Sequence, residues 1–281
     1  MATVPGSASV ATLPDRPEIE IRAVTTPEEF AACVDLQRQT WGYGFSDVVP
    51  VSMMQITVKM GGICTGAFGS DGDLLGVVFG VTGIRGGELA HWSHMLAVRS
   101  DARNMGIGRR LKLAQKEQLL VHRVNTMYWT FDPLVARNAH LNLNHLGATV
   151  AEYVPDMYGT SDSDLHQLGT DRFIARWDLL DSRGPRGRTE RKAGGDGFSE
   201  SCLVIGVPGD SDRVPADADV VEVLIPSDIE SIEEHSFEEA FRWRLSTRRA
   251  FTRLLDGPYE ITGFVSGRDH ARYIVSRTAN P

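Results

Sequence analysis

"HMLAVRSDARNMGIGRRLKLAQKEQLL", residues His94 to Leu120, holds the features that decide the fold. It begins as an apolar run, breaks into a basic turn with Gly106 and Gly108, and continues with apolar residues at helical spacing. A helix that starts after such a turn points backbone N–H groups outward at its partly positive end, which favours an anion. Glycine lets a bound group approach the backbone, and arginine suits phosphate oxygens. The stretch therefore predicts a phosphate-binding turn.

The pattern of this turn is R-x-x-G-x-G, formed by Arg103, Gly106 and Gly108. It differs from the G-x-G-x-x-G of dinucleotide-binding domains, which also require an acidic residue after a second strand. It also differs from the P-loop, whose lysine is missing here. Neither a Rossmann dinucleotide site nor a P-loop is supported.

The composition is that of a soluble globular protein, with 281 residues, 42% hydrophobic and 23% charged. The net charge of −8 argues against a protein that coats nucleic acid, while leaving room for a local basic patch. The three scattered cysteines (Cys33, Cys64 and Cys202) form no zinc or disulfide pattern, so we expect reduced thiols, no metal and a cytoplasmic location. No run reaches the ~18 apolar residues of a membrane span, and no signal peptide is recognisable.

Four segments are expected along the chain. Residues 1–18 read as a flexible tail, 19–180 as the main domain, 181–200 as a linker and 201–281 as a smaller C-terminal α/β extension. The linker, "DSRGPRGRTERKAGGDGFSE", is rich in glycine and charge and has almost nothing to bury. Within the main domain we expect a strand from Ile19, a helix that begins near Pro27, two hairpin strands, a long strand into the opening motif and its helix. A further strand, a helix from about Ala136 to Leu146 and two closing strands complete it.

The C-terminal segment predicts a β-α-β-β order. "DADVVEVLIP" reads as a strand, and Phe237 to Leu255 as a helix with Phe241, Leu245 and Phe251 among its buried residues. A hairpin then turns at Gly267–Asp269. The segment holds no catalytic motif. It could cover the open edge of the main sheet or form a homodimer contact.

At the opening motif the chain resembles the GNAT (GCN5-related N-acetyltransferase) superfamily, whose signature is a strand, R/Q-x-x-G-x-G/A and a helix. "LAVRSDARNMGIGRRLKLAQ" matches it, and the order of elements agrees from Ile19 to Leu180. The phrases "WSHMLAV", "WTFDPL" and "ARNAHLNL" look most like a little-characterised bacterial branch with a C-terminal extension. The resemblance implies a mixed α/β (α+β) fold, with a central and mostly antiparallel sheet flanked by helices.

The resemblance also implies an acyltransferase that takes acetyl-CoA, or another acyl-CoA, as its donor. In the family, the turn binds the CoA pyrophosphate, which here implicates Arg103, Asn104, Met105, Gly106, Ile107, Gly108 and Arg109. The splayed fourth strand offers backbone groups to the pantetheine arm, and its matching residues are Leu96, Ala97 and Val98. Asn138 matches a family asparagine that hydrogen-bonds the coenzyme arm near the following helix.

His94 is the first candidate for the base that such a transfer needs, since a histidine titrates near neutral pH. By strand alternation it shares a face with Leu96 and Val98, which places it near the thioester carbonyl, and His91 points to the other face. The arylalkylamine acetyltransferases have a similar phrase, H-x-H-A-L-A-V, whose second histidine matches His94. A buried structural histidine is the alternative, in which case Glu88 is the next candidate.

The general acid of many GNAT enzymes is a tyrosine four residues before the glycine that ends the helix after the fifth strand. Counting back from Gly147 gives Leu143, so that tyrosine is missing. Tyr153 or Tyr158 could replace it from the next segment, or water could. Both tyrosines could equally be ordinary packing residues.

The acceptor is expected to be a small-molecule amine. Trp41, Tyr43 and Phe45 fall in the loop that lines the acceptor pocket in this fold, and Asp132 could orient the amine. Two alternatives stay open: transfer from the phosphopantetheine of an acyl carrier protein, and a module that binds acyl-CoA without turnover. No nucleic-acid or membrane partner is expected.

Overall fold

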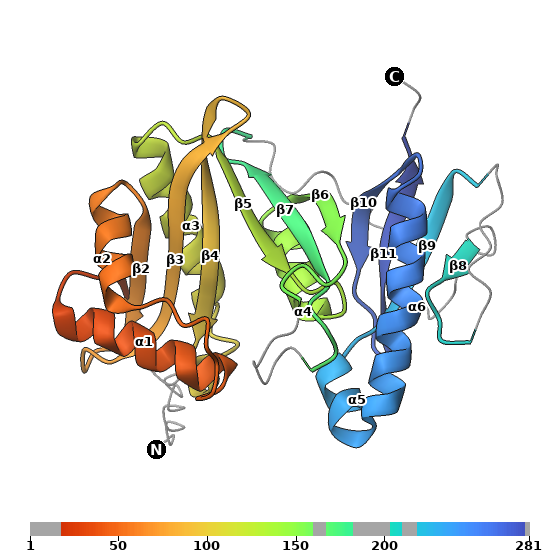
Figure 1. Cartoon of the computed structure of the whole chain (residues 1–281), viewed down its shortest axis with the longest axis horizontal. Coiled ribbons are helices and arrows are strands. Elements are labelled where there is room, and N and C mark those ends of the chain that lie inside the picture. Colours follow the sequence, from red (N-terminus) through yellow and green to blue (C-terminus); the bar gives the residue numbers. More distant parts are fainter. Residues whose placement is uncertain (1–17, 160–166, 182–202, 210–217, 279–281) are drawn as a thin grey trace, which may run out of the picture.

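The computed structural model describes residues 18–159, 167–181, 203–209 and 218–278, and its first part is a seven-stranded mixed sheet (Figure 1). The spatial order is β1-β2-β3-β4-β5-β7-β6, and neighbours are antiparallel except for the parallel pair β4–β5. The strands are β1 (Glu20–Ala23), β2 (Ile63–Phe68), β3 (Leu74–Arg85), β4 (Glu88–Val98), β5 (Thr126–Phe131), β6 (Thr149–Val154) and β7 (Arg172–Asp178).

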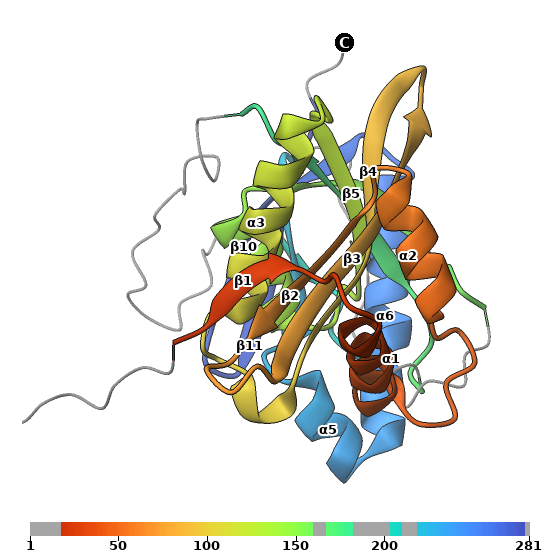
Figure 2. The same cartoon turned by 90° about the vertical axis from the view of Figure 1, so that its left-hand side faces the viewer.

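Helices cover both faces of this sheet. Helices α1 (Pro27–Trp41) and α2 (Val51–Lys59) pack on one face in a core with strands β2 to β4. Helix α3 (Ile107–Val121) packs on the opposite face, and Figure 2 shows the sheet edge-on between the two groups. Helix α4 (Ala136–Ala139) continues into the π-helical turn η2 (His140–His145). The mixed α/β fold predicted from the glycine turn is confirmed, although helix α2 was not expected.

Strands β4 and β5 pair over a short stretch only. Their Cα partners are His91 with Met127 and Trp92 with Tyr128, although β4 has 11 residues and β5 has six. Beyond these pairs the two strands diverge toward their carboxyl ends, as Figure 1 shows. We call the space between the diverging ends of β4 and β5 the wedge. Its apex is the last pair, Trp92–Tyr128.

The C-terminal part is a second sheet of order β10-β11-β9-β8 with two helices. It contains β8 (Leu203–Ile205), β9 (Val220–Pro226), α5 (Ile229–His235), α6 (Phe237–Leu255), β10 (Tyr259–Val265) and β11 (His270–Arg277). The expected β-α-β-β order is present, with β8 and α5 in addition. The predicted tail and linker lie almost entirely outside the described residues, so those boundaries stay predictions.

The burial expected for helix α6 is correct for Phe251 but wrong for Phe241 and Leu245, which are 40% and 38% exposed. The physical reason is that the helix turns a different face inward. Ala240, Trp243 and Ala250 pack into the core, and the buried guanidinium of Arg244 points at the main domain. Arg244 thus occupies the inward side of the helix, where the spacing of apolar residues predicts Phe241 and Leu245.

One hydrophobic core runs through both parts of the chain. It joins residues of β5 and β7, such as Trp129 and Phe173, to residues of α6 and β11, such as Phe251 and Tyr273. The ring centroids of Phe173 and Phe251 are 4.8 Å apart, and the Tyr273 hydroxyl donates to the Pro133 carbonyl at 2.8 Å. The extension is therefore packed against the β5–β7–β6 side of the main sheet.

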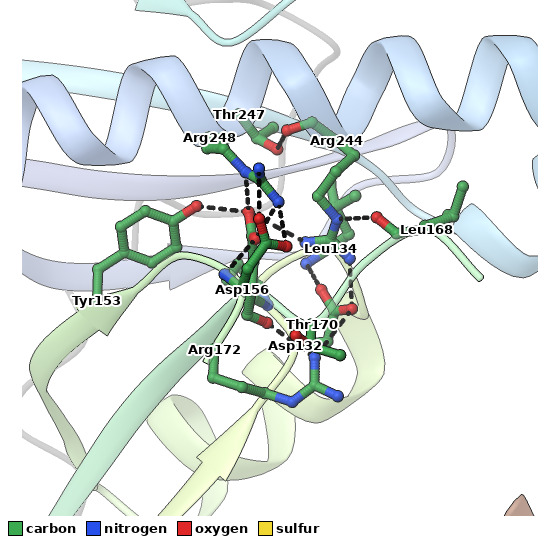
Figure 3. Close-up of polar contacts among 12 residues, drawn as sticks. Asp132, Leu134, Tyr153, Asp156, Leu168, Thr170, Arg172, Arg244, Thr247 and Arg248 are labelled. Carbon is green, nitrogen blue, oxygen red and sulfur yellow. Dashed lines mark hydrogen bonds and ion pairs between the residues drawn. The ribbon is translucent and has the colours of Figure 1, made fainter. Parts of the chain in front are cut away.

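Carboxylates of the main domain pair with arginines at the same interface (Figure 3). Asp132, directly after β5, accepts from Arg244 of helix α6 at 2.5 Å and lies 3.6 Å from Arg172. Arg248 of the same helix pairs with Asp171 and, through two nitrogens, with Asp156. Asp171 is fully buried, and burial alone would raise its pKa. Hydrogen bonds from Arg248 and the Tyr153 hydroxyl more than offset this and lower the pKa.

Replacing Arg244 with methionine should destabilise the protein by about 3 kcal/mol, because removing one partner leaves Asp132 with a weaker ion pair in a buried setting. The midpoint of urea unfolding measures this change. Arg242→Met on the same helix is the matched control, because Arg242 is exposed, and should change stability by less than about 0.5 kcal/mol. Equal stabilities of the two variants would contradict a bracing role for Arg244.

Candidate functional site

The turn from β4 to α3 has the backbone of an anion cradle. A short 3-10 turn, η1 (Ser100–Ala102), follows β4, and then Asn104 and Gly106 adopt positive φ angles of 64° and 76°. The intrahelical ladder starts with Arg110 N to Gly106 O at 3.1 Å. The N–H groups of the three residues from 107 to 109 therefore precede it. A left-handed residue before a helix start is the geometry of an anion-binding nest.

The arginines around this turn divide into two groups. Arg99 pairs with Asp101 at 2.7 Å, and Arg110 donates to the Ile19 carbonyl at 2.6 Å, so both have structural partners. Arg103 and Arg109 are exposed on the turn. A Cβ added at Gly106 would meet nothing within 4 Å, so crowding does not require glycine there, whereas the positive φ favours it.

The side chains of β4 beyond the apex alternate between the two cores. Leu96 and Val98 pack with Ile107 and Leu111 on the α3 side, while Ala97 packs on the α1–α2 side. The edge of this stretch that faces β5 lies beyond the ladder, so its backbone groups line the wedge. The structure thus brings the predicted arm-binding residues and the glycine turn together along one strand.

The predicted face of His94 is wrong. Gly80 of β3 pairs with Ser93, but Phe79 pairs with Met95, so His94 is an extra residue in β4. Such a bulge shifts the alternation by one residue. The His94 ring contacts Phe79 of the α1–α2 core edge-on, with centroids 6.3 Å apart. His94 therefore lies on the α1–α2 face and not on the face of Leu96 and Val98.

His94 is exposed at the surface of the strand, although the protein around it removes part of the water from its ring. This burial lowers the pKa of His94 below 6.5, and the carboxylate of Asp47 partly offsets the shift. Asp47 belongs to the loop between α1 and α2. A lowered pKa favours the neutral ring, which is the form that accepts a proton.

His91 lies on the α3 face, opposite His94 as expected, and is fully buried. Its Nε2 lies 3.0 Å from the amide nitrogen of Gln115, and its Nδ1 lies 3.1 Å from the Thr82 hydroxyl. Because Gln115 donates, the partners assign the His91 proton to Nδ1. A Cβ at Gly80 would lie 2.3 Å from His91 Nε2, so glycine is required for this close approach.

These contacts belong to a buried chain of hydrogen bonds that sequence reasoning missed. The chain runs in one direction, each group donating to the next: Lys112, Ser93, Gln115, His91, Thr82 and the Gly61 carbonyl. Its members come from α3, β4 and β3, and it ends at the turn between α2 and β2 that holds Gly61. Buried polar groups are tolerated when each finds a partner, which this chain provides.

Lys112 begins the chain from helix α3. Its Nζ donates to Ser93 Oγ at 2.8 Å, lies 3.9 Å from Met127 Sδ and stands 4.1 Å from the centre of the Trp129 ring. Burial lowers the pKa of Lys112 to about 7. Burial, followed by the charge of Lys112, lowers the pKa of His91 to about 3. Lys112 lies on the inward side of helix α3, about one turn before Gln115, which is also buried.

The aromatic loop after α1 lies on the same face as His94. Trp41 packs against the α1–α2 core, and its ring lies 6.2 Å from that of Phe45. Tyr43 is 79% exposed. The loop also carries Asp47, the residue that acts on the pKa of His94. The three predicted acceptor-binding aromatics therefore belong to a loop on the α1–α2 side of the sheet, and Asp47 of that loop acts on His94.

Asp132 and the two candidate tyrosines lie at the β5–β7 side. The Tyr153 hydroxyl donates to Asp171 at 2.7 Å, and burial raises its pKa well above the usual range. The Tyr158 hydroxyl lies 3.0 Å from that of Thr130 on β5. Asp132 pairs with Arg244 as described above. Tyr153 and Asp132 thus hold the extension in place, and no contact joins them to His94 within the described residues.

The remaining candidates are more distant. Glu88 begins β4 at the hairpin end, six residues before His94, which is about 20 Å along a strand. Asn138 lies on α4 beside Arg137, which forms a two-point ion pair with Glu230 of α5 at 2.5 and 2.6 Å. Leu143 packs against the main core, so no hydroxyl stands at the position of the missing tyrosine.

In the part of the chain that the structure describes, no group of three or more His, Cys, Asp or Glu side chains is arranged to hold a metal ion. No helix there is both long and apolar enough to cross a membrane.

No protein-family model and no curated protein matches this sequence. Solved structures do match in fold. YncA from Salmonella typhimurium, solved with its cofactor acetyl-CoA, is 15% identical over 59% of this chain and 97% of its own, with a TM-score of 0.47. The aminoglycoside 6'-acetyltransferase type Ii is 19% identical over 57% and 97% (TM-score 0.46). The ribosomal-protein-S18-alanine N-acetyltransferase from Escherichia coli is 16% identical over 58% and 94% (TM-score 0.45).

The buried His91 should make stability depend on pH. Its folded pKa of about 3 lies below the unfolded value of 6.5, so only the unfolded chain gains this proton between those limits. The free energy of unfolding should therefore fall as pH drops below 6.5, with His91 contributing up to about 1.4 kcal/mol per pH unit. Urea unfolding at pH 7 and pH 5 of the wild type and of His91→Gln measures this. In the variant, the free energy of unfolding should depend less on pH, by the contribution of His91. If it changes with pH as much as in the wild type, His91 does not titrate as described.

Proposed function

We propose that this chain is a GNAT-type acyltransferase, which transfers an acyl group from acetyl-CoA or another acyl-CoA to an amine. The single observation that carries this proposal is the wedge between β4 and β5 that leads from the glycine turn to the apex. Along β4 it places three features one after another: the glycine turn, which suits an anion, a strand edge open to hydrogen bonding, and His94 near the apex.

The turn suits the pyrophosphate of CoA. Its N–H groups and the exposed Arg103 and Arg109 supply donors and positive charge, while Gly106 leaves the approach open. The edge of Met95 to Val98 would bind the amides of the pantetheine arm as a neighbouring strand does. The residues present therefore fit this donor, and Asn138 on α4 would hydrogen-bond its arm.

His94 is the proposed base. A neutral imidazole on the α1–α2 face can take the proton of an amine that approaches from that face, directly or through a water molecule. The aromatic loop of Trp41, Tyr43 and Phe45 would then bind an acceptor with some apolar body. The Asp47 carboxylate in the same loop favours a cationic amine before it loses its proton.

Three further parts of the proposal concern the biological setting. The acceptor would be a small-molecule amine, and the protein would work in the cytoplasm. An acyl carrier protein is the alternative donor, because a carried phosphopantetheine needs the strand edge but not the adenine contacts. A homodimer through the extension is a further alternative.

Replacing Gly106 with glutamate should weaken acetyl-CoA binding by about 100-fold or more, which corresponds to about 2.7 kcal/mol. The reason is that a negative side chain would occupy the place of the pyrophosphate. Isothermal calorimetry measures the affinity.

Gly87→Glu is the matched control for this variant. Gly87 also has a positive φ, of 85°, and open space at its Cβ, but it lies in the hairpin at the far end of β4. It carries the same backbone strain and charge change and should leave the affinity within about threefold. Equal affinity of both folded variants for acetyl-CoA would show that the pyrophosphate does not bind at this turn.

Replacing His94 with alanine should lower turnover by about 100-fold while acetyl-CoA still binds, as is typical when a general base is lost. The loss should shrink as pH rises, because a larger share of the amine is then neutral. Thiol release over a panel of amines, followed between pH 6 and pH 9, measures this, with thermal unfolding as a check on folding. A stable variant with wild-type turnover at pH 7 would exclude His94 as the base.

A further inference from the structure

Lys112 is a completely buried amine that the proposed chemistry has not used. It is 2% exposed, and its contacts in the described part of the chain are a hydroxyl, a thioether and an indole ring. None of these carries a negative charge. A buried lysine without a carboxylate partner is costly, because burial disfavours the charged form. A position of this kind therefore invites a functional explanation.

The amine stands at the apex of the wedge. Its Nζ contacts Ser93 on β4, one residue after the last paired residue of that strand. It also contacts Met127 and Trp129 on β5, on either side of the last pair. Lys112 thus bridges the two strands at the level where they begin to diverge.

The length of the wedge places the thiol end of the donor near this amine. Val98 adjoins the turn, and Ser93 lies five residues back along β4, which is about 17 Å. An extended pantetheine arm is of similar length. With its pyrophosphate at the turn, the donor would bring its sulfur to the level of Ser93.

We propose that Lys112 is the proton donor to the thiolate that leaves in acyl transfer, a step that rests on the function proposed above. As the carbon–sulfur bond of the tetrahedral adduct breaks, its electron pair stays on sulfur. Lys112 gives up one ammonium proton, the N–H bond breaks and an S–H bond forms. A neutral amine and a neutral thiol result, and Lys112 regains its proton from solvent before the next turnover.

The hydrogen-bond chain holds the amine ready for this step. Ser93 uses its own proton on Gln115, so its oxygen can only accept from Lys112. One N–H of the ammonium is fixed in this way, and β5 lies on the other side of Nζ, with Met127 Sδ at 3.9 Å and the centre of the Trp129 ring at 4.1 Å. Lys112 would thereby take the role of the tyrosine whose place Leu143 occupies.

The protonation of Lys112 is tuned by few neighbours. The titratable groups that face it are His91 on β4 and Lys116, one turn along α3, whose Nζ lies 5.1 Å from the centre of the Trp177 ring. Neither is a carboxylate, and burial is the cause of the lowered pKa of Lys112. A pKa of about 7 leaves a protonated fraction at neutral pH and makes the amine more acidic than an ordinary thiol.

The decisive experiment follows the thiol of bound CoA by its thiolate absorbance in the ultraviolet, so that no acceptor is needed. Saturating CoA is titrated with wild type, with Lys112→Met and with Lys116→Met as the matched control. Calorimetry first verifies that each protein binds CoA. If the wild type does not bind CoA, the proposed function fails, and that result is separate from a failure at Lys112.

In the wild type and in Lys116→Met, the ammonium beside the sulfur should lower the pKa of the bound thiol. In Lys112→Met that pKa should rise by about one unit or more, the size expected for losing a charge within hydrogen-bonding range. Equal thiol pKa values in the three proteins would overturn the proposal. If Lys112→Met does not fold, Lys112→Gln, which can still donate to Ser93, replaces it.

A second measurement separates proton donation from direct attack on the donor. After incubation of the wild type with acetyl-CoA, peptide mass analysis should find Lys112 unmodified. An acetylated Lys112 would make it a nucleophile and overturn its assignment as the acid.

Discussion

The short parallel ladder between β4 and β5 is the constraint on which the rest of the structure depends. Two pairs join the strands, and the right-handed twist of a sheet then carries their carboxyl ends apart. An open strand edge inside a protein is normally covered, because unpaired backbone groups are costly when buried. Here the open edge starts at the glycine turn, which favours a ligand that combines an anionic end with an amide-bearing arm.

The wedge needs two stable walls. The β4 wall is fixed by the α1–α2 core on one face and by α3 on the other. The β5 wall continues into a core that the extension shares, and the pair between Asp132 and Arg244 braces it. Buried ion pairs add little net stability but penalise other arrangements, because a carboxylate without its arginine is expensive. The extension thus packs against the β5 wall and holds it through this ion pair.

The sequence allowed the fold to be predicted because its strongest local signals agree with one another. The strand, the glycine turn and the helix of the opening motif lie where expected, and Phe237–Leu255 forms the helix predicted for it. Helix α2 was missed because the nine residues Val51–Lys59 carry no acidic residue in the first turn and no capping side chain.

The finer errors have physical causes. Strand alternation misplaced His94, because a bulge is decided by packing against β3 and leaves no mark in the period of β4. Apolar periodicity misplaced Phe241 and Leu245, because an ion pair set the inward face of α6. Lys112 was missed because a lysine on a helix is usually solvated, and only the closing of β4 and β5 over it shows its burial. The face of His94, the inward face of α6 and the burial of Lys112 all depend on contacts between segments that lie far apart in the sequence.

The central claim is that a donor with an anionic end lies along β4 from the glycine turn to the apex. Hydrogen–deuterium exchange with and without acetyl-CoA tests this most directly, because it reports the backbone amides that would bind the donor. The account predicts slower exchange in peptides that cover Met95–Val98 and Gly106–Arg110, with little change in β9, β10 and β11. Protection confined to the C-terminal sheet, or no protection of β4 at saturating acetyl-CoA, would contradict it.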